Sequence, residues 1–117
     1  MLGDFAMAFT ENTRLTKFIA QLPLTTEISA RVASKSMEPT IHVGQKVRIV
    51  RAIFDEARVG DVIAFAKGKR RKIWVHRIVG TRKVTRGMVG YVTKGDNRVH
   101  EDGALVFEEN FIGLVST

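Results

Sequence analysis

The sequence contains no cysteine, only 2 prolines and no long apolar run. Without cysteine there can be no disulfide framework, no thiolate metal site and no cysteine nucleophile. No window approaches the roughly 18 apolar residues that a membrane-spanning helix needs. The N-terminus also lacks the positively charged start of a secretory signal, because Asp4 comes before a short apolar stretch. We therefore expect a soluble chain without a membrane-spanning segment, and the compartment is left undetermined.

The composition that is present is typical of one ordinary globular domain. The 117 residues are 44% hydrophobic and 26% charged, which suffices for one hydrophobic core but not for two. Lysine and arginine outnumber aspartate and glutamate by 19 to 12, which gives a net charge of +7. This excess favours an anionic partner, which could be nucleic acid, an acidic lipid surface or an acidic peptide.

Apolar spacing predicts a mainly β domain with a short amphipathic helix in front. Within residues 11–22, apolar residues recur at the spacing of one helix face, and Pro23 provides a stop. The face consists of Leu15, Phe18, Ile19 and Leu22. Beyond it the period changes to two, which indicates strands. We expect them near residues 28–32, 47–49, 62–66, 73–79, 88–93 and 111–115. The chain thus divides into a helical segment, residues 1–25, and a β domain, residues 26–117.

Two surfaces have more than one interpretation. The strands at 62–66 and 73–79 are joined by a basic hairpin tip, KGKRR, which we interpret as a solvated turn, with lipid or nucleic-acid contact as the alternative. The apolar helix face is expected to pack on the sheet or on a partner, and docking at a membrane interface is the alternative. His42 and His100 are interpreted as surface residues. Trp74 is interpreted as a core residue, with a position lining the cleft beside His76 as the alternative.

Three separated segments, residues 34–41, 73–80 and 92–102, contain residues suited to nucleophilic catalysis. A serine hydroxyl is a poor nucleophile at neutral pH unless a base lies within hydrogen-bond reach, and His76 in its apolar strand is the candidate base for Ser36. Such a histidine is usually oriented by a third group that accepts its other ring N–H. The last segment offers two aspartate carboxylates, Asp96 and Asp102, so the parts of a triad are present.

The amino-acid sequences of these segments resemble those of a known family. SKSMEPTI, GDVIAF, IWVHRIVG and VTKGDNRVHED are similar, in order and spacing, to the boxes of type I signal peptidases. VHRIV and TKGDN resemble the archaeal and endoplasmic-reticulum members, which have histidine where bacterial members generally have lysine. The resemblance covers about residues 32–102 and implies a signal-peptidase or LexA-like catalytic β domain. It also implies a serine endopeptidase that cuts precursor or signal peptides after small residues, without metal or organic cofactor.

The resemblance also implies a role for each site residue. Ser36 matches the nucleophile and His76 the base, while Asp102, in the acidic pair after TKGD, matches the third triad member. Ser34 matches the position from which some relatives supply a hydroxyl to the oxyanion hole. Asp96 is expected to hold the turn or to support the site indirectly.

The chain departs from the family pattern in three places, one of which is Gly44-Gln45, where Gly-Asp is common. Lys35 stands beside the nucleophile where many relatives have glycine, and this affects the expected oxyanion geometry. Relatives also have a membrane-spanning helix where this chain has the short amphipathic one. A membrane surface or a membrane-anchored partner is therefore a candidate partner beside the precursor peptide, and the oligomeric state is left open.

Two other functions come from different classes. A LexA-like self-cleaving protein would share the Ser-Met-x-Pro start, but such proteins use a lysine base and carry a helix-turn-helix domain, for which about 25 residues are too few. A non-enzymatic basic β module that binds nucleic acid is supported only by the net charge of +7. Nucleic acid is disfavoured because no exposed aromatic platform is evident.

Overall fold

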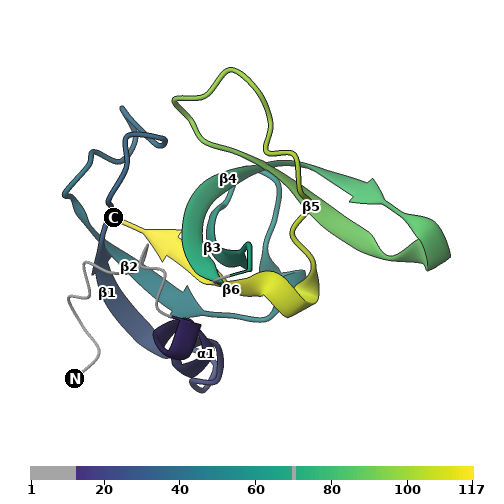
Figure 1. Cartoon of the computed structure of the whole chain (residues 1–117), viewed down its shortest axis with the longest axis horizontal. Helices are drawn as coiled ribbons and strands as arrows, with labels where there is room; N and C mark the ends of the chain where they lie inside the picture. The colour runs from purple at the N-terminus through teal and green to yellow at the C-terminus, as the bar shows by residue number, and fades with distance from the viewer. Residues whose placement is uncertain (1–12, 70) are drawn as a thin grey trace.

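The computed structural model describes residues 13–69 and 71–117. In this part of the chain a short helix precedes six strands (Figure 1). The elements are α1 (Thr13–Ala20), β1 (Glu27–Arg31), β2 (Lys46–Arg51), β3 (Val62–Lys67), β4 (Lys72–Lys83), β5 (Val89–Lys94) and β6 (Phe111–Ser116). Three single-turn 3-10 helices are η2 (Phe54–Glu56), η3 (Thr85–Gly87) and η4 (Glu108–Asn110). The prediction of a mainly β domain is confirmed.

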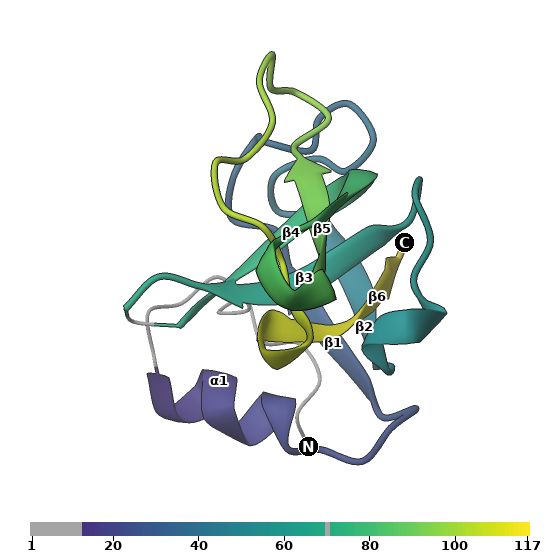
Figure 2. The ribbon, with the colours of Figure 1, turned by 90° about the vertical axis from the view of Figure 1, so that its right-hand side faces the viewer.

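The strands form one antiparallel sheet in the order β1-β2-β6-β3-β4-β5. The last strand in the chain, β6, lies between β2 and β3 and joins the two halves of the sheet. Residue 113 on β6 must be glycine, because a Cβ there would lie 2.1 Å from the Val50 carbonyl oxygen. The loop after β1 and the loop after β5 rise side by side at one end of the sheet (Figures 1 and 2).

Apolar residues fill two clusters, and β3 contributes to both. Ala64 and Ala66 belong to the cluster that also includes Ile19 of the helix. Ile63 and Phe65 belong to the other. Successive strand residues point to opposite faces of a sheet, so β3 is buried on both sides. This explains why its sequence is a continuous apolar run rather than an alternating one.

The predicted helix forms, but its packed face is different from the expected one. Ile19 is buried, and Leu22, just beyond the helix, packs on the same cluster. Phe18, however, is 49% exposed, whereas Thr16 is fully buried. The prediction that Phe18 shares the packed face is therefore wrong, because the helix is turned so that the residues at i and i+3, Thr16 and Ile19, face inward. The predicted start at residue 11 and the Leu15 side chain lie outside what the structure describes.

The six predicted strands are all present, and β3 and β4 form the predicted hairpin. The fourth strand is longer than predicted and continues to Lys83, with a register shift between Ile78 and Gly80. Within the described residues, no helix has the length and apolar character that a bilayer crossing requires.

Candidate functional site

Ser36 lies in the loop between β1 and β2, and its neighbour anchors that loop to the core. Met37 is buried in the same cluster as Ile41, whose N–H donates to the Met37 carbonyl at 2.9 Å. Ser36 itself is only 6% exposed. Because the residue that follows it is an apolar core residue, the position of Ser36 is fixed by packing rather than by the loop alone.

The Ser34 hydroxyl contacts both the backbone N–H and the side chain of Ser36. The two hydroxyl oxygens are 3.0 Å apart, and the Ser36 N–H points to the Ser34 hydroxyl at 3.3 Å. A backbone N–H and a hydroxyl therefore lie side by side at the nucleophile candidate. These are the two kinds of donor that can stabilise a developing oxyanion.

His76 is held in β4 by a carboxylate. Its side chain is 2% exposed, and its Nδ1 lies 2.6 Å from Oδ2 of Asp102. The Thr93 hydroxyl donates to the same oxygen at 2.6 Å, and the Asp102 N–H donates to the Thr93 carbonyl at 2.8 Å. The ring of Trp74 meets the imidazole edge-on, with centroids 5.4 Å apart. The ring orientation is thus fixed by the carboxylate of Asp102 and by the ring of Trp74.

The electrostatics of this pair favour an ionised Asp102. Burial acts to raise the pKa of Asp102, but hydrogen bonds from His76 and Thr93 outweigh it, so the pKa lies below its usual value. An ionised carboxylate can only accept hydrogen bonds, so Nδ1 carries the proton in the pair. In the neutral ring Nε2 is then the acceptor, which is the state that a general base needs.

Gly95 is where the serine loop meets the histidine. A Cβ at this position would lie 2.6 Å from the Ser36 carbonyl oxygen and 3.1 Å from Nε2 of His76. Both groups therefore crowd one side of the same glycine. The Asn97 N–H also donates to the Ser36 carbonyl at 2.8 Å. Only a residue without a side chain lets the two segments approach this closely.

The structure brings Ser36 and His76 to one place without a hydrogen bond between their side chains. Nε2 of His76 is buried and has no hydrogen-bond partner among the described residues, and the Ser36 hydroxyl contacts that of Ser34. Catalytic hydrogen bonds are often loose in free enzymes and tighten only with substrate.

Asp96 has a different set of partners from Asp102. Its two carboxylate oxygens accept hydrogen bonds from Nε and Nη2 of Arg77 at 2.9 and 2.8 Å, and the Thr40 hydroxyl donates at 2.6 Å. The pKa of Asp96 is lowered, chiefly by the hydrogen bond from Arg77. Asp96 therefore ties the serine loop to β4, while Asp102 contacts the imidazole.

Four residues that contribute to this arrangement are not candidates from the sequence. They are Arg77, Thr93, Gly95 and Asn97. Three of them lie within the TKGDN motif, and Arg77 directly follows His76. Their position in the same motifs as the candidate residues was the only sequence feature that could have identified them. Their contacts depend on the loop conformation, which spacing alone does not reveal.

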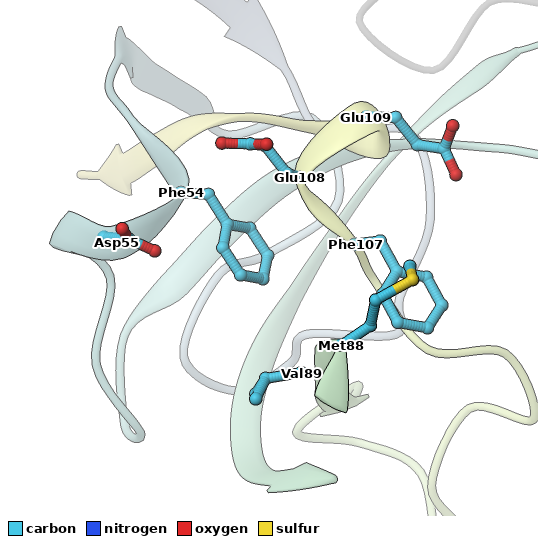
Figure 3. A pocket seen from close by; sticks show the side chains of 7 residues that line it. All are labelled: Phe54, Asp55, Met88, Val89, Phe107, Glu108 and Glu109. Carbon is cyan, nitrogen blue, oxygen red and sulfur yellow. The ribbon is translucent and has the colours of Figure 1, made fainter. Parts of the chain in front are cut away.

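One hollow borders this group of residues, and another lies away from it. A small one of about 170 Å³ adjoins Ser34 and is lined by Ala33, Ser34, Lys72, Ile73 and Trp74. Trp74 is thus half-buried beside His76 and borders a hollow, so it is not only a core residue. A larger hollow, shown in Figure 3, shares no lining residue with the site. His42 and His100 are exposed, as predicted.

The comparisons with known proteins agree on one family. The family described as "Signal peptidase, peptidase S26" matches residues 14–82, more than half of the chain. The match includes Ser36 and His76 but ends before Asp96 and Asp102. The chain is 32% identical over 77 residues to the signal peptidase complex catalytic subunit SEC11C of Homo sapiens, covering 66% of this chain and 40% of that protein.

The same figures hold for SEC11C of Mus musculus. The chain is also 38% identical over 81 residues to signal peptidase I W of Bacillus subtilis, covering 68% of this chain and 41% of that protein. It therefore spans about two fifths of the length of these relatives.

Proposed function

Because the chain belongs to the signal peptidase family, peptidase S26, we propose that it is a serine endopeptidase that cleaves precursor or signal peptides after small residues. The observation that carries the proposal is the state of His76. One ring nitrogen is hydrogen-bonded to Asp102 at 2.6 Å. The other is buried, has no hydrogen-bond partner within residues 13–69 and 71–117, and lies near the segment that contains Ser36. A base oriented in this way is what a serine hydroxyl requires.

In the proposed reaction, Ser36 Oγ attacks the scissile carbonyl carbon while Nε2 of His76 takes the hydroxyl proton. The tetrahedral intermediate then collapses, the peptide C–N bond breaks, and His76 returns the proton to the leaving amine. A water molecule repeats the sequence on the acyl-enzyme and releases the new carboxylate. Asp102 stabilises the imidazolium that forms in each half and keeps the proton on Nδ1.

The oxyanion would be bound by the Ser36 N–H and the Ser34 hydroxyl. In the free chain these two groups contact each other at 3.3 Å, so neither is committed to a distant partner. Removing one such donor typically lowers turnover by about 10²- to 10³-fold. The Asn97 side chain donates a hydrogen bond to the Lys35 carbonyl at 3.1 Å. This bond holds the backbone of Lys35 against the loop that follows β5.

We propose that the substrate binds as an extended strand along the segment before Ser36. β1 is an edge strand of the sheet, and the small hollow at Ser34 and Trp74 lies where this strand leads to the serine. Main-chain pairing with an edge strand provides affinity, while shallow hollows select side chains by size.

A lipid surface is the proposed second partner. α1 carries the exposed Phe18, and Leu24 just beyond it is also 49% exposed. The helix lies beside β4, whose hairpin with β3 has the basic tip (Figure 2). An amphipathic surface with cations at its border is suited to an anionic membrane interface. A membrane-anchored protein partner is the alternative occupant of this face.

The deciding experiment is incubation of the protein, with and without detergent, with a synthetic peptide that carries an Ala-x-Ala site. Mass spectrometry should find a single cut after the second alanine. Ser36→Ala should abolish it, whereas Ser116→Ala, an exposed serine on β6, should leave the rate unchanged. Equal cleavage by wild type and Ser36→Ala would remove the proposal. Salt-sensitive DNA binding without any cleavage would favour the basic β module instead.

A further inference from the structure

The larger hollow, of about 540 Å³, lies between three elements that take no part in the proposed catalysis. They are η2, the start of β5 and the segment that leads into η4 (Figure 3). Its lining residues are Phe54, Asp55, Met88, Val89, Phe107, Glu108 and Glu109. A hollow of this volume is within the usual range of ligand sites.

The walls of this hollow are held in place by the core. The ring of Phe54 stacks on Tyr91, with centroids 4.2 Å apart, and the Tyr91 hydroxyl donates to the Phe54 carbonyl at 2.6 Å. On the other wall, residue 90 is a glycine against which Phe107 packs, since a Cβ there would lie 3.0 Å from the Phe107 ring. The shape therefore exists before anything binds.

The hollow combines apolar side chains with carboxylates of one sign. Met88 and Phe107 lie side by side, and the Phe54 ring points inward across from them (Figure 3). Asp55, Glu108 and Glu109 border the same space, and none makes an ion pair within the described residues. In a chain with a net charge of +7, this is a local acidic site. It complements a ligand that has both a cation and an apolar group.

The backbone at the hollow has an open strand edge. Tyr91 exchanges two hydrogen bonds with Val106, N–H to carbonyl, at 2.8 and 3.0 Å, on the side of β5 away from β4. In an antiparallel ladder the N–H and C=O groups alternate sides, so those of Val89, two residues earlier, point to the same outer side. The chain leaves this edge after Val106 and turns into η4. In the described part of the chain, no strand pairs with the outer edge at Val89.

We propose that this hollow binds an extended peptide segment of a partner protein, which adds to β5 at Val89. The open backbone groups of Val89 pair with the peptide main chain. A basic side chain of the peptide pairs with a carboxylate at the border of the hollow, and an apolar side chain two positions away lies on Phe54 and Phe107. The two must be two positions apart because strand residues alternate sides. The recognised pattern is thus apolar-x-basic in an extended segment.

The test uses the wild-type protein and fluorescently labelled short peptides. A peptide that repeats Leu-Ser-Lys-Ser, and so places leucine and lysine two positions apart, should bind in fluorescence anisotropy, and the same peptide with glutamate in place of lysine should not. The double substitution Glu108→Gln and Glu109→Gln should weaken binding by about three- to tenfold, the effect expected for exposed charge pairs. Glu27→Gln, on β1, is the matched control and should bind as wild type does.

The pairing of the peptide main chain with β5 is tested by a separate measurement. A leucine-lysine peptide N-methylated at alternate residues should lose binding, and the Val89 amide resonance should shift with the unmethylated peptide only. Equal binding of the lysine and glutamate peptides, or of the methylated and unmethylated ones, would overturn the proposal. So would self-association of the protein that the double substitution abolishes, because the occupant would then be a second copy of this chain.

Discussion

At the scale of single residues, two carboxylates of one loop have separate partners. Asp102 accepts from the imidazole of His76, and Asp96 accepts from Arg77 and Thr40. The first contact acts on a ring that the proposed reaction protonates. The second acts on the positions of two backbone segments. The same chemical group should therefore produce different losses when it is removed.

We expect Asp102→Asn to lower the rate of peptide cleavage by up to about 10⁴-fold, because the ring tautomer is no longer fixed and the imidazolium is less stable. The fold should persist, since Asn can still accept from Thr93. Single-turnover kinetics together with urea unfolding measure the two effects. Asp96→Asn is the comparison and should lose relatively more stability than rate. The reverse pattern, a nearly active Asp102→Asn and a stable but inactive Asp96→Asn, would exchange the two roles.

The pKa of Asp96 also predicts how stability depends on pH. Its hydrogen bond from Arg77 lowers the pKa in the folded state. The ionised carboxylate is therefore more stable in the folded chain than in the unfolded chain. This contribution is complete above the unfolded carboxyl pKa of about 3.9, and it is lost as pH falls through the lower folded value. Wild type should therefore lose stability in urea as the solution is acidified below about pH 4. Asp96→Asn should lose less over the same interval, and parallel curves for the two proteins would contradict this account.

At the scale of elements, the site depends on how two loops approach. β1 leads to the serine loop and β5 leads to the loop with Gly95 and Asp102, while β4 carries His76 between them. The strands were predictable because alternating apolar residues are a local signal. The contact of the Ser36 carbonyl with Gly95 and Asn97 was not, because it joins residues far apart in the chain.

Gly95→Ala tests this contact. The added Cβ would lie 2.6 Å from the Ser36 carbonyl oxygen, so the backbone of the serine loop must move away from His76. We expect stability to fall by about 1–3 kcal/mol and cleavage to fall by about 10²-fold, since displacements near 1 Å have effects of this size. Gly103→Ala is the matched control in the same loop, because a Cβ there meets nothing within 4 Å. Equal activity of the two variants would show that the close approach is unimportant.

At the scale of the whole molecule, the order of strands was beyond what the sequence could predict. Nothing in residues 111–115 indicates that they form a central strand between β2 and β3. The helix was predicted from its period, but its rotation was wrong because Thr16, and not Phe18, faces the core. The motif residues Ser36, His76 and Asp102 were predicted by resemblance. The bonding of His76 to Asp102, and its separation from the Ser36 hydroxyl, required the structure.

The rotation of α1 leads to the last prediction. With Ile19 packed inward, Phe18 is left 49% exposed at the end of the molecule opposite the serine loop (Figure 2). If this surface docks on lipid, the apolar side chain enters the interface and the nearby cations bind anionic headgroups, each worth about 1 kcal/mol. Co-sedimentation should therefore be stronger with anionic than with neutral vesicles, and added salt should weaken it.

Phe18→Ser should lower this binding several-fold, while the helix remains packed through Ile19. Val99→Ser is the matched control, because Val99 is an exposed apolar residue, 88% exposed, on the loop after β5 at the other end of the sheet. It should bind vesicles as wild type does, since only the α1 end faces the lipid. Equal binding to neutral and anionic vesicles, or equal losses for the two variants, would assign this face of α1 to a protein partner instead, because a lipid surface requires both the charge and the location.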